Sequence, residues 1–359
     1  MNGKTTIPLG PQHPVLPEPL HLKLVMEDEK VVEAIPAIGY VHRGLEKLAE
    51  VKDYTQNVFL VERICGICSV QHAQAYVQGI ETLMNVEVPE RGKYLRVIWA
   101  ELHRIHSHLL WLGLVADAFG FEALFMQCWR DREKVMDIME ATSGARVIIS
   151  TNVVGGTKRD ISAEHLAEIV KVADEVHADM KRMENTFLND YTVKHRLVGV
   201  GKLSKEQAFS LGAVGPMARA SGIAQDLRTM GYAAYPHLGF QMVVEQDGDC
   251  YARTAVRLKE VYECVRLVKE AISKLPQGDY KVPVKGNPDG EVISRLEQPR
   301  GEVLYYIKAN GTKNLDRLRV RTPTFANIPT LLAMLPGSQL ADVPVLLLTI
   351  DPCISCTER

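Results

Sequence analysis

Four of the seven cysteines in this chain form two pairs with the same spacing. Cys65 and Cys68 lie in VERICGICSVQH, whereas Cys353 and Cys356 lie in DPCISCTER at the opposite end of the sequence. CxxC pairs in a reducing compartment are typical of metal binding or redox chemistry. Four thiolates favour soft or borderline metals, as in zinc and iron–sulfur sites.

The distance between the two pairs distinguishes among these sites. Zinc ribbons and fingers place their cysteine pairs about 15 to 20 residues apart, because each pair closes a small loop. Here most of the chain lies between the pairs, which argues against structural zinc. A thiol–disulfide couple at one end would explain only half of the pattern. The residues therefore predict a buried thiolate metal site of a redox type, and they leave the metal open.

Composition limits the class of protein. The 359 residues are 46% hydrophobic, enough for a sizeable core. A formal net charge of −2 offers no basic excess for phosphates, so we expect no nucleic-acid partner. No run of about 18 apolar residues predicts a membrane-spanning helix, and the segment MNGKTTIPLGPQHP lacks the apolar core of a secretory signal. We expect a cytoplasmic chain that reaches a membrane only through its partners.

The middle of the chain has the pattern of long helices. Ser162 is a plausible N-cap, Ser204 and Gln207 fit a capping box, and Ser143-Gly144 would end a helix. The CxxC motif at 65–68 opens a further helix rich in Ala and Gln. Apolar residues at helical spacing predict long helices over 91–119, up to about Thr142, over 162–190 and over 253–275.

Both ends of the chain have strand patterns. Alternation predicts a hairpin over 20–36, and the stretch from 301 to 323 predicts two strands around a glycine turn. Residues 281–292 look like a loop, a short helix is expected near 328–335, and the apolar run 343–350 predicts a buried strand.

The expected fold class is therefore α+β, with a central bundle of long helices and small β elements from the two terminal regions. We expect a single domain over 1–359. Its parts would be a β-rich N-terminal part (1–60), a helical core (61–275) and a β-containing C-terminal part (276–359).

Six motifs in order along the chain carry a resemblance to a known family. They are GPQHP, GYVHRGLEKL, ERICGICSVQH, HSHLLWLGLVADAFG, QPRGE and DPCISCTER. Together they resemble the large subunits of [NiFe] hydrogenases, and GPQHP, the short length and the CTER ending resemble the energy-converting, membrane-bound type, including CO-induced enzymes. The chain is also similar to the quinone-site subunit of complex I, whose members lack the four cysteines. A quinone-binding scaffold is thus the alternative function.

The resemblance implies an NiFe(CN)2CO centre held by the two cysteine pairs. Cys65 and Cys353 would be terminal nickel ligands, and Cys68 and Cys356 would bridge nickel to an iron that carries CO and two cyanides. The implied reaction is the heterolytic cleavage and formation of H2, in which the metal acts as Lewis acid and template.

The resemblance also implies roles for residues around the metals. Arg300 would overhang the open site and polarise bound substrate. Glu18 would receive protons from Cys353, and Asp117 would lie near the site and hold Arg300. The plainer alternatives are an arginine in a surface turn, an exposed loop glutamate and a cap at a helix end.

Further roles are expected for His72, Thr349 and Glu46. His72 would donate a hydrogen bond to a bridging sulfur, or would be an ordinary core histidine. The Thr349 hydroxyl would bond a cyanide, or would be a strand residue without a role. In many relatives a C-terminal histidine and a glutamate like Glu46 bind Mg2+ or Fe2+. Here the corresponding residue is Arg359, which is no metal ligand, so a direct pair between Arg359 and Glu46 is the alternative.

Other histidines and cysteines are expected to be structural. His103, His106 and His108 would pack and form hydrogen bonds between helices rather than bind metal. The three single cysteines would be buried without a special role, namely Cys128, Cys250 and Cys264.

The implied partners are a small subunit with a [4Fe–4S] cluster, ferredoxin-type iron–sulfur subunits and antiporter-like membrane subunits that pump H+ or Na+. Maturation would need nickel-insertion proteins and a protease that, in relatives, removes a C-terminal tail. The expected location is the cytoplasmic side of the cell membrane, with the chain held there by its partners.

Overall fold

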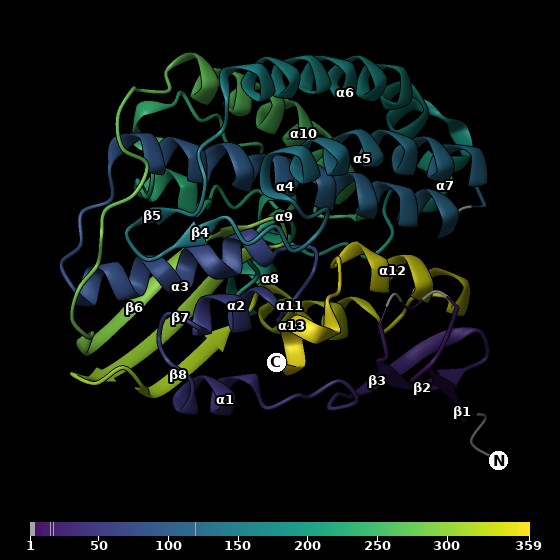
Figure 1. Ribbon diagram of the computed structural model, residues 1–359. Coiled ribbons are helices and arrows are strands. Elements are labelled where there is room, and N and C mark those ends of the chain that lie inside the picture. The colour runs from purple at the N-terminus through teal and green to yellow at the C-terminus, as the bar shows by residue number, and fades with distance from the viewer. Residues whose placement is uncertain (1–3, 15, 17, 119) are drawn as a thin grey trace.

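A bundle of long helices forms one half of the molecule. The computed structural model describes residues 4–14, 16, 18–118 and 120–359. Figure 1 shows the bundle across the upper half and the sheets below it, so the predicted α+β class is confirmed. The bundle helices are α4 (Glu90–Ala118), α5 (Glu122–Ser143), α6 (Ala163–Asn189) and α10 (Cys250–Ser273).

Helix α4 is buried around nearly its whole circumference, which shows that it lies in the centre of the bundle. It packs against α5 and α10, and α6 covers those two helices from outside. Apolar residues of α6 recur every three or four positions and its other faces are exposed, so only one stripe meets the core.

The helix ends follow the predicted signals. The Ser162 hydroxyl accepts a hydrogen bond from the His165 N–H at the start of α6, and Ser204 and Gln207 form a capping box. Gly144 ends α5 with a φ of 89°, a left-handed conformation that glycine adopts at little cost.

Two antiparallel three-stranded sheets flank the bundle. The N-terminal sheet has the order β1–β2–β3, and the C-terminal sheet has the order β6–β7–β8. The predicted hairpin and the two strands around a glycine turn are confirmed, and each sheet gains one strand that was not predicted. Part of the predicted loop at 281–292 belongs to β6. The strands are β1 (Lys4–Leu9), β2 (His21–Glu27), β3 (Lys30–Ala37), β6 (Asp289–Gln298), β7 (Gly301–Asn310) and β8 (Leu315–Arg321).

The strand predicted over 343–350 is wrong, since Val343–Thr349 forms helix α12. A short run that is apolar at every position carries no periodicity to separate a buried strand from a buried helix. Pro344 lies in the first turn, where it favours a helix start. The helix packs against α4, whose Trp111 indole donates to the Leu348 carbonyl at 2.7 Å.

Shorter elements connect these parts. They are α1 (Leu45–Val51), α2 (Asn57–Glu62), α3 (Ser69–Leu83), β4 (Asn152–Val153), β5 (Gly156–Thr157), α7 (Tyr191–Leu197), α8 (Lys205–Ser210), α9 (Pro216–Ala220), η1 (Leu227–Met230), η2 (Tyr235–His237), α11 (Pro323–Met334), η3 (Leu340–Asp342) and α13 (Ile354–Glu358). The predicted helix near 328–335 lies within α11. Among the residues that the structure describes, no helix is both long and apolar enough to cross a membrane.

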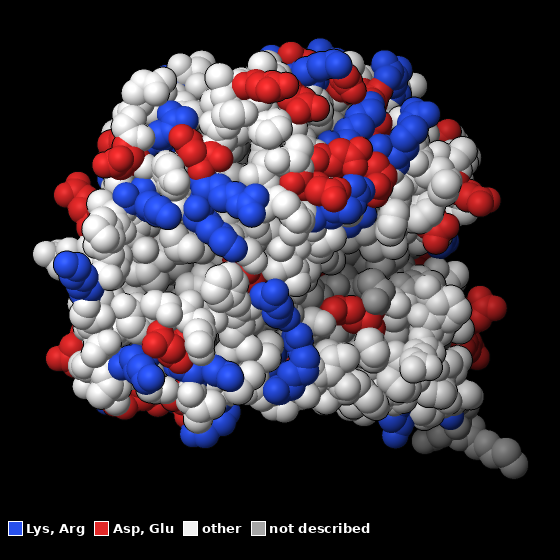
Figure 2. All heavy atoms as spheres, in the orientation of Figure 1, with Lys and Arg blue, Asp and Glu red and all other residues white. Residues whose placement is uncertain are grey.

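The two ends of the chain meet below the bundle. Helix α13 lies against α11, which in turn contacts β7 (Figure 1). One apolar cluster joins residues of α1, α2, α3 and the C-terminal sheet with all four paired cysteines. Figure 2 shows charged side chains of both signs interspersed over the face in view. The fold therefore brings both CxxC motifs into one buried region.

Candidate metal centre

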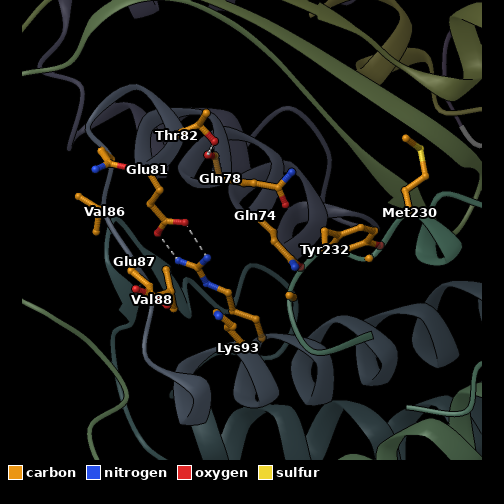
Figure 3. Close-up of a pocket in the computed structure, with 14 residues that line it drawn as sticks. Gln74, Gln78, Glu81, Thr82, Val86, Glu87, Val88, Lys93, Met230 and Tyr232 are labelled. Carbon is orange, nitrogen blue, oxygen red and sulfur yellow. Dashed lines mark hydrogen bonds and ion pairs between the residues drawn. The ribbon is translucent and has the colours of Figure 1, made fainter. Parts of the chain in front are cut away.

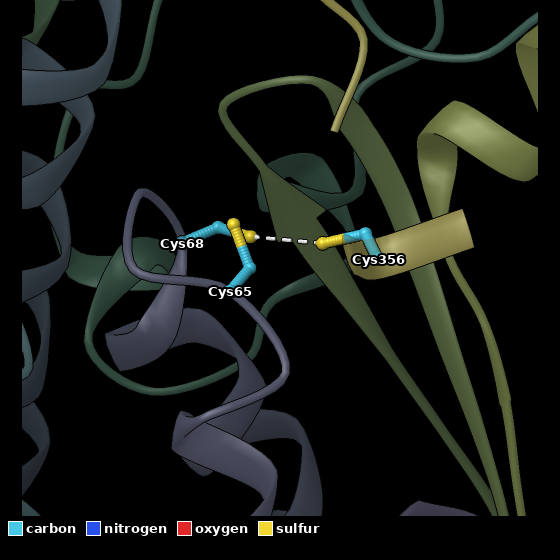
Figure 4. Close-up of side chains that lie close together, drawn as sticks. All are labelled: Cys65, Cys68 and Cys356. Carbon is cyan, nitrogen blue, oxygen red and sulfur yellow. Dashed lines mark hydrogen bonds between the residues drawn. The ribbon is translucent and has the colours of Figure 1, made fainter. Parts of the chain in front are cut away.

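The four paired cysteines form one cluster. The Sγ atoms of Cys68 and Cys356 are 3.6 Å apart, and those of Cys65 and Cys353 are 3.2 Å apart. The Sγ atoms of Cys65, Cys68 and Cys356 all lie within 4.8 Å of one another (Figure 4). All four residues are buried. A compact set of four thiol sulfurs is a donor set that fits a soft or borderline metal.

Short backbone segments position these sulfurs. Cys68 directly precedes α3, so its CxxC motif lies at the positive end of a long helix. The Ile67 N–H donates to the Cys65 Sγ, and the Cys356 N–H donates to the Cys353 Sγ, both at 3.3 Å. Each CxxC loop thus curls around its own first cysteine.

The thiols influence one another strongly. Hydrogen bonds from Cys353, Cys356 and Cys68 lower the pKa of the Cys65 thiol well below its usual value. Burial, by contrast, raises the pKa of Cys68 well above the usual value. The site therefore favours one thiolate surrounded by thiols, and a bound cation would favour loss of the remaining protons.

Arg300 lies at this cluster with Asp351 as its partner. Its Nε donates to the Asp351 carbonyl at 2.8 Å, and a terminal nitrogen lies 2.9 Å from the Asp351 carboxylate. Burial opposes the charge, but Asp351 and the Cys65 sulfur raise the pKa of Arg300 well above its usual value. The other terminal nitrogen has no hydrogen-bond partner among the described residues. Arg300 is therefore a fixed buried cation with one free donor.

The expectation that Asp117 holds Arg300 is wrong. Asp117 lies in the last turn of α4, where its side chain is exposed and its carbonyl accepts from the Gly120 N–H. An exposed carboxylate at a helix end needs no buried partner, which fits the alternative of a residue at a helix end. Asp351, directly before the Pro-Cys of the second motif, takes the role expected for Asp117.

Glu18 reaches the second CxxC loop. Its carboxylate accepts from the Ser355 N–H at 2.9 Å and from the Ser355 hydroxyl. Ser355 stands between Cys353 and Cys356 in the sequence. A hydrogen bond with Cys356 lowers the pKa of the Cys353 thiol. The hydrogen bond with Cys65, burial and the charge of Glu18 act the other way and together raise this pKa well above its usual value. Glu18 is therefore close enough to act electrostatically on Cys353.

His72 bridges the cluster and the C-terminal sheet. Its Nε2 lies 3.5 Å from the Cys356 Sγ, and its Nδ1 lies 2.7 Å from the Tyr305 hydroxyl. Burial lowers the pKa of His72 to about 4, so the ring is neutral near pH 7. The predicted contact between His72 and one of the two sulfurs expected to bridge is therefore present, and Tyr305 orients the ring.

The Thr349 hydroxyl lies against α10 instead. It accepts from Arg253 at 3.4 Å, and the Thr349 carbonyl accepts from Arg257 at 3.1 Å. Its expected bond to a cyanide stays a prediction without a supporting contact. Two other threonines touch the cysteine loop: Thr324 Oγ1 accepts from the Cys353 N–H at 3.2 Å, and Thr322 Oγ1 donates to the Cys356 carbonyl at 3.0 Å.

Glu46 is saturated by protein groups. Its carboxylate accepts from Arg359 at 2.9 Å, from Arg319 at 2.6 Å and from the Val320 N–H at 2.9 Å. Burial raises the pKa of Glu46, but the three hydrogen bonds outweigh burial, so the pKa is lowered. A second metal would have to displace two guanidinium groups, so the residues present do not fit Mg2+ or Fe2+ here. The direct pair of Arg359 and Glu46 is present.

The histidines of α4 lie among other helices. His108 Nε2 lies 2.8 Å from the Glu260 carboxylate on α10, and His103 Nε2 lies 3.1 Å from the Val147 carbonyl and 3.3 Å from the Ser69 hydroxyl. These contacts agree with hydrogen bonding for His103 and His108, whereas the buried His106 ring has no hydrogen-bond partner among the described residues. The three single cysteines are buried as predicted.

Several site residues were not predicted. Their spacing in the sequence gives no sign that they converge, since they come from a strand, a helix N-cap and two helices, namely Tyr305 of β7, Thr322 before α11, Thr324 of α11 and Ser355 of α13. Asp351 had a signal, because a carboxylate two residues before the first cysteine of a CxxC motif, in an apolar setting, needs a buried cation as partner.

Comparison with known proteins defines the class. Residues 43–116 match the nickel-dependent hydrogenase family, and residues 118–287 and 283–359 match the respiratory-chain NADH dehydrogenase 49 kDa subunit. The chain belongs to the family of complex I 49 kDa subunits and [NiFe] hydrogenase large subunits. Within it, the chain is a hydrogenase-type large subunit of the energy-converting complexes.

Individual relatives cover the whole chain. The membrane-bound hydrogenase subunit alpha of Pyrococcus furiosus is 40% identical over 98% of this chain and 87% of its own. The carbon monoxide-induced hydrogenase of Rhodospirillum rubrum is 37% identical over 99% of both chains. A solved chain from the membrane-bound sulfane sulfur reductase, an archaeal respiratory membrane complex, superposes with a TM-score of 0.95 at 30% identity over 99% of both chains.

Proposed function

We propose that this chain is the catalytic subunit of an energy-converting [NiFe] hydrogenase that interconverts H2 with protons and electrons. The observation that supports this proposal most is the meeting of four cysteine sulfurs from the two ends of the chain. The same fold also occurs in a sulfane sulfur reductase complex, so the fold alone does not select the reaction.

The ligand roles follow the two sulfur pairs. In this proposal Cys65, Cys68, Cys353 and Cys356 would hold the nickel–iron group. When bound, the nickel–iron group supplies Lewis-acid activation of H2 and redox capacity. The neutral His72 ring stabilises the Cys356 sulfur and orients it.

Two charged residues support proton and substrate handling. Arg300, held by Asp351, keeps one terminal nitrogen without a partner among the described residues, and this nitrogen can donate to bound substrate. Glu18, held by Ser355, serves as the proton acceptor for the Cys353 sulfur, since its carboxylate is fixed beside that loop. Both side chains are oriented before substrate arrives, which reduces the reorganisation that the reaction needs.

The proposed partners follow from the same class. Electrons pass to or from a small subunit with a [4Fe–4S] cluster and then ferredoxin-type subunits, and antiporter-like membrane subunits use the released energy to move ions. The relatives include subunits of membrane-bound complexes, which supports a peripheral location at a membrane. In this proposal the chain lies on its cytoplasmic side. Nickel-insertion proteins and a maturation protease complete this set.

Metal content of matched cysteine variants tests the ligand assignment. Cys353→Ser should lose nickel and H2 turnover, whereas Cys128→Ser, which changes an equally buried cysteine outside the cluster, should keep both. Nickel at the wild-type level in Cys353→Ser would contradict the proposal.

A quinone-binding scaffold remains the second candidate, because most of the chain matches the 49 kDa family. It predicts no nickel in the wild-type complex and no effect of Cys353→Ser on metal content. The same measurement therefore separates the two functions.

A further inference from the structure

Helix α3 carries a row of glutamines that the proposed chemistry does not use. Gln71, Gln74 and Gln78 are spaced by three and four residues, so they share one face of the helix. Gln71 lies one turn after Cys68, and Gln78 lies towards the other end of α3. The row thus runs along the helix away from the cysteine cluster.

The outer end of this row opens into a cavity of about 680 Å3. Gln74 and Gln78 of α3, residues of α4 and the 230–233 segment line it, and Figure 3 shows Gln74 and Tyr232 at the same side of it. Its cations are paired: Arg96 lies 2.5 Å from Glu81, and Lys93 lies 2.6 Å from Glu90. A polar cavity with paired cations suits water better than an anionic ligand.

The inner glutamines are buried with unsatisfied amides. Gln74 is 1% exposed, and within the described part of the chain neither of its amide atoms has a hydrogen-bond partner. Gln71 donates to the Ala100 carbonyl at 2.9 Å, but its Oε1 has no partner there. An unsatisfied buried polar atom costs about 1 to 3 kcal/mol. Ordered water commonly satisfies such groups.

The unsatisfied polar atoms continue on α4. Arg104 lies one helical turn after Ala100, and its NH1 has no partner among the described residues. Its NH2 donates to the Glu297 carbonyl at 2.8 Å. The Glu297 N–H in turn donates to the Tyr232 hydroxyl at 3.4 Å, and Tyr232 lines the cavity. The cavity wall and α4 therefore meet at the end of β6.

The end of β6 leads to the metal centre. Gln298 is fully buried, and neither of its amide atoms has a partner in the described part of the chain. Ser294 of the same strand meets Gly79 of α3, and alternate residues of a strand share a face, so Gln298 faces α3. Two residues further on is Arg300, whose NH1 has no hydrogen-bond partner among the described residues.

We propose that Gln71, Gln74 and Gln298 hold a file of water molecules that connects the cavity of Figure 3 with the metal centre and carries protons between them. The amides keep their own protons and orient the water. One proton enters the file at the cavity for each proton delivered at the centre. This role rests on the proposed function.

Isotope exchange with solvent tests the file directly. Gln71→Leu and Gln74→Leu keep side-chain size but remove the polar atoms. In the purified complex each should slow the exchange of D2 with H2O by at least about tenfold, since a proton-transfer group contributes on the order of 10²-fold. Conversion of para-hydrogen to ortho-hydrogen needs cleavage without solvent protons and should continue. Gln74→Glu, which stays polar, should restore exchange.

Gln78→Leu is the matched control, because Gln78 is partly exposed in the open cavity and lies outside the file. It should leave exchange unchanged. Wild-type exchange rates in both Gln71→Leu and Gln74→Leu would overturn the proposal.

A high-resolution structure of the complex, with or without metal, supplies a second readout. Ordered water should bridge Gln74, Gln71 and Gln298 in the wild type and be lost in Gln74→Leu. If the wild-type structure shows no ordered water between Gln74, Gln71 and Gln298, the proposed water file is contradicted even when the complex turns over H2. A complex without para-hydrogen conversion but with the water file would instead contradict the proposed hydrogenase function.

Discussion

The Glu18 carboxylate is held by both polar groups of Ser355, the residue next to Cys356. Two hydrogen bonds fix its orientation, and its charge acts on Cys353. A carboxylate in this position can exchange a proton with the sulfur loop without moving far. Proton transfer at Glu18 is therefore separable from metal binding at the cysteines.

The variant Glu18→Gln should separate proton transfer at Glu18 from metal binding at the cysteines. The amide keeps the size and an acceptor oxygen for Ser355 but cannot take up a proton, so we expect H2 turnover to fall by about 10²-fold. Nickel content should stay at the wild-type level, as measured by elemental analysis of the same preparation. Glu29→Gln, an exposed glutamate in the β2–β3 turn, is the control. Unchanged turnover in Glu18→Gln would remove this carboxylate from the proton path.

At the scale of single residues, the sequence was informative where residue type and spacing carry the chemistry. The CxxC pairs follow from residue type and spacing, whereas the sulfur that His72 contacts, that of Cys356, belongs to the other motif and does not follow from the position of His72 near Cys68. The partner of Arg300 did not follow either, because the resemblance and the apolar helix pattern point to Asp117, whereas the structure pairs Arg300 with Asp351. Side-chain exposure at a helix end depends on tertiary packing that periodicity does not report.

At the scale of elements, two glycines position Arg300 through backbone contact. Gly215 precedes α9 with a φ of 65°, and a Cβ there would lie 2.3 Å from the Arg300 carbonyl oxygen. Gly301, directly after Arg300, has a φ of 128°, and its Cβ would lie 2.7 Å from the Gly215 nitrogen. Any side chain at either position would push β7 away from α9 and move the guanidinium.

Gly215→Ala and Gly212→Ala form a matched pair, because Gly212 has a φ of 68° but a Cβ there would meet nothing within 4 Å. Both changes carry the backbone cost of a positive φ, about 1 kcal/mol. Only Gly215→Ala adds a clash, so we expect its free energy of unfolding to fall by about 2 kcal/mol more and its H2 turnover to drop. Denaturant unfolding and turnover of both variants measure this. Equal losses would show that the contact does not position Arg300.

The elements themselves were predictable where caps and periodicity agree. Ser162, the Ser204–Gln207 box and Gly144 mark the helix ends correctly. The first and last sheets each gained a strand, since β1 contains proline and β6 begins with Asp289-Gly290, both typical of turns. The run at 343–350 was misassigned because uniform burial removes the periodic signal.

At the scale of the whole molecule, the C-terminal segment is tied to residues 39–46. The Glu358 carboxylate accepts from the Gly39 N–H at 2.5 Å and from the Val41 N–H at 2.6 Å, and Arg359 pairs with Glu46. These contacts close the cysteine site without a second metal ion. Protein groups thus hold the residues after Cys356 against residues 39–46.

Arg359→Met should loosen this closure. It keeps much of the side-chain volume but removes an ion pair that is only 18% exposed on the arginine side. We expect faster hydrogen exchange over 351–358, by about fivefold for a loss near 1 kcal/mol. Arg319→Met, whose guanidinium is 57% exposed, should have a smaller effect. A chelator should leave wild-type exchange in this segment unchanged, and a chelator effect as large as that of Arg359→Met would contradict the metal-free closure.

The most direct test of the central claim is infrared spectroscopy with metal analysis on the anaerobically purified, matured complex. The account predicts about one nickel and one iron per chain, bound at its four-thiolate site, together with stretching bands of CO and cyanide. Zinc alone, without those bands, would contradict it and return Cys65, Cys68, Cys353 and Cys356 to a structural role.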